Sequence, residues 1–302
     1  MHSLHRERKP FLSAKTFICS PSPGLAGLKG AVDSFPQFVI MYRTPNKPKL
    51  GHKLMIVAIL IGREGSTGFP GKNVIPVAGR PLAAWPLLTA RETAKIGRTY
   101  VSTDSVRLKE IAREYGAHVI DRPAHLCSQA ALGEHAFQHA HGVIRERLLV
   151  EGLGEPELYV LLMANSPTVS SVMLTEGVEV MQCRPEIDSA VTVSCYNMWS
   201  PLRARRIGDD GLLHPFVPFE AFGDPNTLNC DRDSQGNAWF ADMGASIIRP
   251  RNLDDLDGGM LPQKWMGQKI YPIKNVAGLD IDYAWQMPQA AYWLQTHRKP
   301  PE

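Results

Sequence analysis

Apolar runs alternate with amphipathic segments along most of the chain from residue 54 onward. Short continuous apolar runs predict buried strands, and apolar residues that recur every three or four positions predict helices. The pattern predicts strands at 54–61, 98–104, 117–123, 157–167, 188–196, 238–250 and 268–273. It predicts helices at 81–95, 106–116, 131–152 and 173–185, and a last apolar helix within 276–297.

This strand–helix alternation predicts an α/β fold with a doubly wound, mostly parallel sheet. Residues from about 199 to 237 break the rhythm with many turn formers, so we expect an insertion there that forms a hairpin, a lid or a dimerisation arm. Ligands of such sheets bind beyond the carboxyl ends of the strands. Three polar stretches follow predicted strands: a glycine-rich loop after residue 61, STD at 102–104 and NSP at 165–167. We therefore expect all three to meet at one edge of the sheet.

The first 52 residues have a different character. They are rich in Pro, Gly and Lys and show no sustained period. Residues 1–53 carry nine Lys or Arg against two acidic residues, a net charge of +7, whereas the whole chain carries +3. We interpret residues 1–52 as a basic leader, either disordered or mis-annotated with translation beginning at Met41 or Met55. A targeting peptide is the alternative, but neither an apolar core nor an amphipathic Arg/Ser helix is clear. Residues 53–302 then form the functional domain.

Bulk properties narrow the class of protein. The chain has 302 residues, 44% of them hydrophobic and 21% charged, which is an ordinary globular composition. The small net charge gives no global argument for nucleic acid binding. The five cysteines are widely spaced without a C-x-x-C pair, which favours a reducing compartment. The longest apolar run is far below the ~20 residues that span a bilayer. We expect a cytoplasmic protein with neither a nucleic acid nor a membrane partner.

The glycine-rich loop at 61–73 follows a buried strand, as phosphate-binding loops do. It is not a Walker A loop, because Ser66 stands where the first glycine belongs and Asn73 where the metal-binding hydroxyl belongs. It is not the dinucleotide fingerprint either, because its glycines are spaced by threes: Gly65, Gly68 and Gly71.

Two cations stand at the ends of this loop. Arg63 offers a planar fork for phosphate oxygens and Lys72 a point charge. Glycines between them let the backbone approach a ligand closely. The loop therefore indicates a nucleotide or phosphate site, with an ordinary strand–loop–helix turn as the alternative.

The loop resembles that of a known family. Residues 58–82, AILIGREGSTGFPGKNVIPVAGRPL, are similar to the nucleotide loop of the acylneuraminate cytidylyltransferases, the CMP-sialic acid synthetase family, which reads close to A-R-x-x-S-K-G-x-P-x-K-N followed by G-x-P-L. VSTD at 101–104, IDRPAHL at 120–126 and LDIDYAWQMPQAA at 279–291 resemble later segments of that family in the same order. The likeness extends from about residue 54 to 294.

The resemblance implies a Rossmann-like nucleotidyltransferase fold and a reaction. A keto-sugar acid would attack the α-phosphate of CTP through its anomeric hydroxyl, giving the CMP-sugar and pyrophosphate. The chain would need Mg²⁺, with Mn²⁺ as a substitute, and would act as a homodimer through the middle insertion. The in-line geometry and the phosphate charge would have to be held by cations.

The resemblance also assigns residues. The catalytic residues implied are Arg63, Lys72 and Asp282. The nucleotide-binding residues implied are Arg63, Gly65, Ser66, Lys72, Asn73, Ser102, Asp104 and Arg122, with Asn73 and Arg122 at the cytosine ring. Asn165 and Ser166 stand at the acceptor side, and Asp280, Asp282 and Asp104 are the metal ligands implied. Carboxylates suit a hard cation that takes oxygen ligands.

Structural alternatives exist for several of these residues. The carboxylates of the acidic turn could cap the last helix, and Asp104 with Ser105 could cap the helix at 106–116. Arg122 could form a surface ion pair with Asp121 or Glu92.

The chain departs from the family pattern mainly where the sugar should bind. Thr67 replaces the loop lysine, and Met163 and Val169 replace a glutamine and an arginine in the Q-P-T-S-P-L-R segment. Residues 127–130 and 243–247 also differ. The acceptor could therefore be a legionaminic- or pseudaminic-type acid rather than sialic acid. Two alternatives remain: a nucleotidyltransferase for another sugar or base, and a non-catalytic nucleotide-binding homologue.

Overall fold

Strand β1 (Met55–Ile61) lies at the centre of the fold because its side chains are apolar on both faces. Its even-numbered residues join one buried cluster and its odd-numbered residues the other. Successive strand residues point to opposite faces of a sheet, so a continuous apolar run is what a strand covered on both sides requires.

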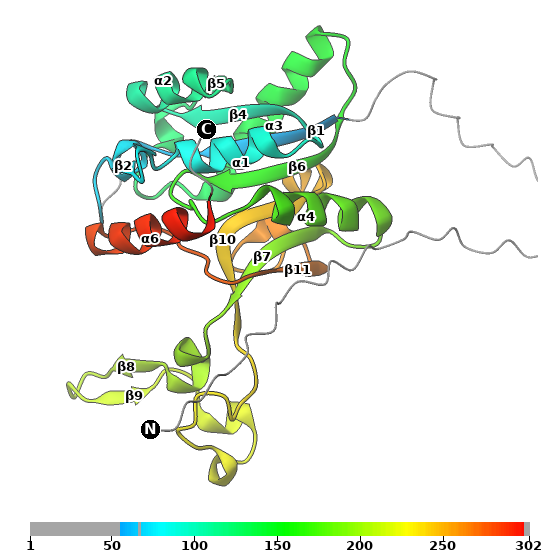
Figure 1. Ribbon diagram of the computed structural model, residues 1–302. Coiled ribbons are helices and arrows are strands. Elements are labelled where there is room, and N and C mark those ends of the chain that lie inside the picture. The colour runs from blue at the N-terminus through cyan, green and yellow to red at the C-terminus, as the bar shows by residue number, and fades with distance from the viewer. Residues whose placement is uncertain (1–54, 66–67, 299–302) are drawn as a thin grey trace, which may run out of the picture. The chain divides into compact units, whose positions relative to one another are not determined.

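The computed structural model describes residues 55–65 and 68–298. Within them a seven-stranded sheet has the order β11-β7-β10-β6-β1-β4-β5 (Figure 1). The other strands of this sheet are β4 (Ile96–Thr103), β5 (His118–Asp121), β6 (Pro156–Met163), β7 (Ser189–Cys195), β10 (Trp239–Ile248) and β11 (Ile270–Asn275). Strand β10 runs antiparallel to both of its neighbours, β6 and β7, and the other pairs are parallel.

Helices cover both faces of the sheet (Figure 1). One face packs against α1 (Ala84–Glu92), α2 (Val106–Glu114), α4 (Ser171–Cys183) and α6 (Met287–His297). The other packs against α3 (Gly133–Val150) and the short α5 (Arg251–Asp254). This arrangement confirms the predicted doubly wound, mostly parallel sheet, and the predicted strands and helices recur with boundaries shifted by a few residues.

A segment that we call the arm, residues 197–238, connects β7 to β10. Its regular elements are a hairpin of β8 (Arg205–Ile207) with β9 (Leu213–Pro215) and four 3₁₀ turns, η3 (Asn197–Trp199), η4 (Pro201–Arg203), η5 (Phe219–Phe222) and η6 (Pro225–Thr227). In Figure 1 the arm continues beyond the paired parts of β7 and β10. It coincides with the predicted break in the rhythm and contains the hairpin expected there; that it is an insertion stays a prediction.

The remaining short elements are β2 (Pro76–Val77) paired with β3 (Arg80–Pro81), and the 3₁₀ turns η1 (Lys72–Val74), η2 (Ala124–Leu126), η7 (Lys264–Met266) and η8 (Ala284–Gln286). The predicted leader, residues 1–52, lies outside the described residues. Within residues 55–65 and 68–298, each helix is too short or too polar to cross a membrane.

Candidate active site

A cleft of about 270 Å³ opens at the carboxyl edge of the sheet. It is lined by six of the residues that the resemblance assigned to the site: Arg63, Lys72, Asn73, Arg122, Asn165 and Asp282. Arg63 follows β1, Arg122 follows β5 and Asn165 follows β6. The strand ends thus bring these polar stretches together, as expected for a doubly wound sheet.

The phosphate loop and the acidic turn meet at one ion pair. The Lys72 side chain is buried, and its Nζ donates to Asp282 Oδ1, 210 residues away in sequence. The Asp282 side chain is about half exposed. A Cβ on Gly68 would lie 2.8 Å from the Asp282 carbonyl oxygen, so only glycine allows the loop this close to the turn.

Arg122 is a buried cation, only 8% exposed. Its Nε donates to Ser102 Oγ over 3.2 Å and its Nη2 to the Ser102 carbonyl oxygen. Burial lowers the pKa of the Arg122 guanidinium. The alternative of a surface ion pair is wrong, because Asp121 pairs with Lys109 at 2.6 Å and Glu92 pairs with Arg298 at 3.1 Å. Among the described residues no carboxylate hydrogen-bonds to Arg122, although the charge of Asp104 acts on it and raises its pKa against the effect of burial.

Asn73 is equally buried, at 7% exposed. Its Nδ2 donates to the Arg63 carbonyl oxygen over 3.3 Å, whereas its Oδ1 has no hydrogen-bond partner in the described part of the chain. Leaving a buried acceptor unpaired costs about 1–3 kcal/mol, and such groups are rare in native proteins. The Asn73 oxygen therefore indicates a donor supplied by a ligand.

The acidic turn is held in place by Asn165. Its side-chain Nδ2 donates to Asp280 Oδ1 and, over 3.1 Å, to the Ile281 carbonyl oxygen. Its backbone carbonyl oxygen accepts from Ile281 N over 3.0 Å. Burial, and then the charge of Asp282, raise the pKa of Asp280 to about 6, although Lys72 acts in the opposite direction. The turn thus concentrates negative charge beside one lysine.

The helix-capping interpretation of the acidic turn is wrong. The Gln286 side-chain oxygen accepts from the backbone nitrogens of Asp282 and Tyr283, at 2.7 and 2.8 Å, and Tyr283 caps η8. The carboxylates of Asp280 and Asp282 are therefore left for other partners.

The turn fits a hard divalent cation. Within the described residues no three Asp, Glu, His or Cys side chains cluster so as to hold a metal. Mg²⁺, however, is commonly bound by one or two protein carboxylates together with substrate phosphates and water, and Asp280 with Asp282 offers that donor set. Asp104 is engaged elsewhere, since its Oδ1 accepts from Glu64 N at 3.1 Å. Ser105 caps α2 through Leu108 N, which confirms half of the capping alternative.

The other candidate residues that the structure describes, Gly65, Ser102, Asp104, Ser166 and Asp280, are not among those that line the cleft. Ser102 is buried and holds Arg122. Ser166 is fully buried, and its hydroxyl donates to the Met243 carbonyl oxygen over 3.1 Å. Gly65 is described and exposed, and Ser66 lies outside the described residues.

Sequence reasoning missed two features of this region. The start of α3 lines the cleft through Leu132, Gly133 and Ala136. Asp242 on β10 is buried beneath the acidic turn. A signal existed for Asp242: it is the one charged residue in the otherwise strand-like run at 238–248.

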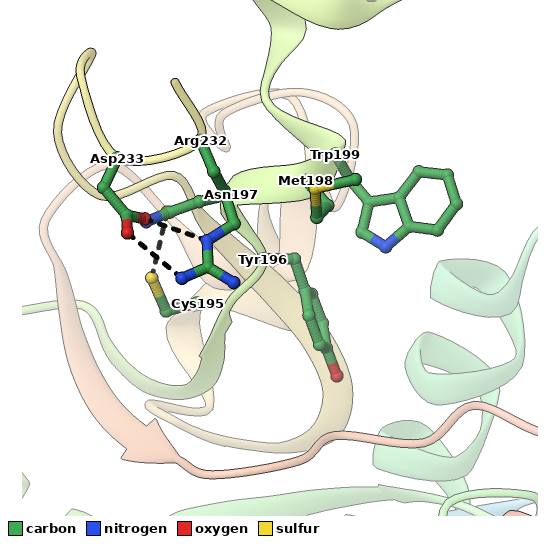
Figure 2. Close-up of a pocket in the computed structure, with 7 residues that line it drawn as sticks. All are labelled: Cys195, Tyr196, Asn197, Met198, Trp199, Arg232 and Asp233. Carbon is green, nitrogen blue, oxygen red and sulfur yellow. Dashed lines mark hydrogen bonds and ion pairs between the residues drawn. The ribbon is translucent and has the colours of Figure 1, made fainter. Parts of the chain in front are cut away.

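A second cavity, of about 400 Å³, lies at the base of the arm (Figure 2). Arg232 and Asp233 form an ion pair there at 3.1 Å, and Asn197 Nδ2 donates to Asp233 Oδ1 over 2.7 Å. None of the residues singled out in the sequence lines it. The candidate active site is therefore the cleft at the sheet edge.

Comparisons with known proteins bear on the family and the fold. A family model described as "Cytidylyltransferase" matches residues 57–145. The chain is 28% identical over 142 residues to an N-acylneuraminate cytidylyltransferase of Escherichia coli O18:K1:H7, covering 47% of this chain and 32% of that protein. It is 26% identical over 178 residues to a 3-deoxy-manno-octulosonate cytidylyltransferase of Bdellovibrio bacteriovorus, covering 53% and 71%.

Among solved structures, a CMP:2-keto-3-deoxy-manno-octonic acid synthetase complexed with CTP covers 80% of this chain and 99% of its own. The TM-score is 0.56 at 14% sequence identity, which supports a shared fold. Residues 57–145 thus match a cytidylyltransferase family model, and the chain is similar to N-acylneuraminate cytidylyltransferases over only 32% and 28% of the length of two of them.

Proposed function

We propose that this protein is a cytidylyltransferase that joins CMP from CTP to a nonulosonic, sialic-acid-like keto-sugar acid and releases pyrophosphate. One observation carries the proposal. A single cleft combines the Lys72–Asp282 ion pair with two buried polar groups: the Asn73 oxygen, which has no hydrogen-bond partner among the described residues, and the Arg122 guanidinium, which donates to Ser102. The first pair suits a triphosphate with its cation, and the second suits a nucleobase.

The nucleobase would lie between Asn73 and Arg122. Cytosine presents an amino group and a carbonyl oxygen on either side of its ring nitrogen N3, so the amino group would donate to Asn73 Oδ1 and the carbonyl would accept from the Arg122 guanidinium. Uracil places an oxygen where cytosine has its amino group. That oxygen would face the Asn73 oxygen, and a site built to pair a donor strongly rejects a ligand that lacks it.

The triphosphate would lie along the phosphate loop. Arg63 and Lys72 would neutralise the charge on the transferred and leaving phosphates, which is where nucleotidyl transfer needs electrostatic stabilisation. The anomeric hydroxyl oxygen of the sugar would attack the α-phosphorus and release its proton to solvent. The bond from that phosphorus to the oxygen bridging to the β-phosphate breaks, and pyrophosphate leaves.

Asp280 and Asp282 would hold Mg²⁺, or Mn²⁺ in its place. When bound, the cation supplies charge neutralisation for the phosphates. Lys72 contacts Asp282, so it would stand next to the same phosphates. Asp104, the third ligand predicted from the sequence, does not join Asp280 and Asp282, because no three such side chains are grouped to hold a metal among the described residues.

The acceptor would enter from the side of Asn165, which lines the cleft, with Ser166 buried behind it. Met163 lines the same side and adds an apolar surface where relatives carry a glutamine. This side of the cleft is where the chain departs from the family pattern, so we leave the particular nonulosonic acid open.

The test is pyrophosphate release by the purified protein with Mg²⁺ or Mn²⁺. Each of the four nucleoside triphosphates is paired with a panel of nonulosonic acids and with 3-deoxy-manno-octulosonate. Release with CTP and one nonulosonic acid is the expected result. Release with another triphosphate or only with a different sugar would instead support a nucleotidyltransferase for another base or acceptor.

A folded protein that binds CTP without releasing pyrophosphate with any acceptor would favour the non-catalytic alternative. The Lys72–Asp282 contact favours catalysis, because a protein that only bound nucleotide would not need carboxylates beside the triphosphate. We also propose that the protein acts as a homodimer through the arm.

A further inference from the structure

Asp242 is a buried carboxylate beneath the acidic turn, 7% exposed. It accepts four hydrogen bonds, from Thr192 Oγ1 at 2.5 Å, Ser194 Oγ at 2.7 Å, Asn275 Nδ2 at 2.9 Å and Gly244 N at 3.0 Å. All four donors are neutral groups. A buried carboxylate with this many donors is held rigidly, because losing any one of them would leave charge unsatisfied in a dry interior.

Three side chains that contact Asp242 or Gly278 come from alternate positions at and just beyond the end of β7. Thr192, Ser194 and Tyr196 point to the same side because the side-chain period of extended chain is two. The Ser194 hydroxyl donates to Asp242 and accepts from Gly278 N at 2.9 Å. The Tyr196 hydroxyl donates to the Gly278 carbonyl oxygen over 2.6 Å. The N–H and the C=O of Gly278 are thus both hydrogen-bonded, one to Ser194 and the other to Tyr196.

Gly278 also lies directly against Asp242. A Cβ at Gly278 would stand 2.2 Å from Asp242 Cβ and 2.3 Å from its Oδ2. The backbone can therefore reach this position only without a side chain. Asp280 follows two residues later, and Leu279 N donates to Thr168 Oγ1 over 3.2 Å in between. The position of Gly278 accordingly sets where the acidic turn begins.

We propose that Asp242 is a positioning residue for the acidic turn: acting through Ser194 and the Gly278 peptide, it fixes where Asp280 and Asp282 present their carboxylates. The proposal rests on the proposed function for the role of those two carboxylates. Catalytic and metal-binding groups must be held within about 0.5 Å, and a misplacement of about 1 Å can cost a factor of about 100 in rate.

Tyr196 extends this set of β7 side chains toward the arm. It lines the cavity at the base of the arm, and Figure 2 shows its hydroxyl directed away from the Arg232–Asp233 pair. The backbone of Gly278 is therefore held by two hydrogen bonds: Ser194 in the sheet core accepts from its N–H, and Tyr196 at the arm base donates to its C=O. Removing either hydroxyl should loosen the turn without touching Asp280 or Asp282.

The test compares wild type with Asp242→Asn, Ser194→Ala and Tyr196→Phe in the full-length protein. Hydrogen–deuterium exchange of the segment 276–286 is measured without metal. Binding of Mn²⁺ in the presence of CTP is followed by the electron paramagnetic resonance signal of free Mn²⁺, and kcat and KM for CTP are measured at saturating Mn²⁺. Ser189→Ala is the matched control, since Ser189 is a buried serine of the same strand that donates to the Met266 carbonyl oxygen over 2.6 Å.

We expect faster exchange at 276–286, at least about fivefold weaker Mn²⁺ binding and about tenfold lower kcat for Ser194→Ala and Tyr196→Phe, with KM for CTP little changed. Asp242→Asn should show the same effects more strongly. Ser189→Ala should lower the unfolding temperature but leave exchange of the turn, Mn²⁺ binding and kcat at wild-type values.

Unchanged exchange and unchanged Mn²⁺ binding in Ser194→Ala and Tyr196→Phe would overturn the positioning role. If Asp242→Asn does not fold, Ser194→Ala and Tyr196→Phe alone test the positioning role. A wild-type protein that neither binds Mn²⁺ with CTP nor releases pyrophosphate would refute the proposed function, whereas the exchange measurement judges the positioning of the turn separately.

Discussion

The Lys72–Asp282 pair joins the phosphate loop to the acidic turn, yet the two residues differ in exposure. The lysine is buried and the carboxylate is about half exposed. Replacing the carboxylate should therefore affect chemistry far more than folding. We expect Asp282→Asn to lower turnover by about 1,000-fold while the unfolding temperature stays within a few degrees of wild type.

Pyrophosphate release and thermal unfolding measure the two effects. Asp257→Asn is the control, because Asp257 is an exposed carboxylate paired with Lys264 at 2.9 Å outside the cleft. Turnover of Asp282→Asn at the wild-type rate would show that the Asp282 carboxylate has no part in catalysis.

Asp280 makes stability depend on pH. Its pKa is raised to about 6, above its ordinary value, so the folded state binds this proton more tightly than the unfolded state. The stabilisation is present at low pH and is lost as pH rises through about 6. The charged groups that act on it are Asp282 and Asp242, which raise the pKa, and Lys72, which lowers it.

Asp280→Asn mimics the protonated carboxyl and keeps an oxygen for Asn165. Without added metal, we expect it to be more stable than wild type at pH 8, with the difference in free energy of unfolding growing by ~1–2 kcal/mol between about pH 4.5 and pH 8. Denaturant unfolding at several pH values measures this. A difference that does not change with pH would show that the carboxyl titrates normally.

At the scale of single residues, the sequence indicated the charged and amide side chains that line the cleft but not the residues that they contact. Arg122 was recognisable from its segment, but its contact with Ser102 depends on the pairing of β4 with β5, which no local pattern contains. Asp242 was missed because its partners come from β7 and β11, far away along the chain.

Periodicity predicted the strands and helices because each buries a regular set of positions. The direction of a strand relative to its neighbours could not be predicted in this way. The period-two pattern of β10 is the same whether the strand is parallel or antiparallel to them. Its pairing with β7 also shifts register between Ala241 and Ser246, and Met243 has a left-handed φ of 57°. Irregularities of this kind are common beside active sites, and here the shift accompanies Asp242.

The approach of the phosphate loop to the acidic turn can be tested at Gly68. A Cβ there would collide with the Asp282 carbonyl oxygen at 2.8 Å, so Gly68→Ala should push the loop away from the turn. We expect KM for CTP to rise about tenfold, with a small change in unfolding temperature because the loop is exposed at this point. The control is Gly142→Ala on α3, where a Cβ meets no atom within 4 Å. An unchanged KM for Gly68→Ala would show that the contact is not needed.

In the described part of the molecule, a hydrogen bond links the base of the arm to the backbone that leads into the acidic turn. Tyr196 at the arm base hydrogen-bonds to the Gly278 carbonyl oxygen, and Asp280 lies two residues beyond. Anything that orders the arm base would therefore also order the acidic turn. The arm is suited to such a contact because it exposes large apolar side chains, Trp199, Ile207, Leu212, Leu213 and Phe216, each more than 60% exposed.

Apolar side chains gathered on one segment are typical of a surface that another protein covers. A second copy of the chain is the partner that we predict, since a stable dimer needs about 800 Å² buried on each partner and a hairpin with several apolar side chains can supply much of it. Sedimentation velocity should give a dimer for wild type and a monomer for Ile207→Asp with Leu213→Asp. Val150→Asp is the control, because Val150 is 88% exposed at the end of α3.

If the dimer also orders the arm base, the monomeric variant should have a lower kcat and faster hydrogen exchange at 276–286 than wild type, with its unfolding temperature nearly unchanged. Val150→Asp should match wild type in every measurement. A wild-type monomer at concentrations where the enzyme is assayed would contradict the predicted dimer. A monomeric variant with wild-type kcat would show that the arm serves assembly alone. The Tyr196 contact would then position the acidic turn within one chain, without any effect of the dimer.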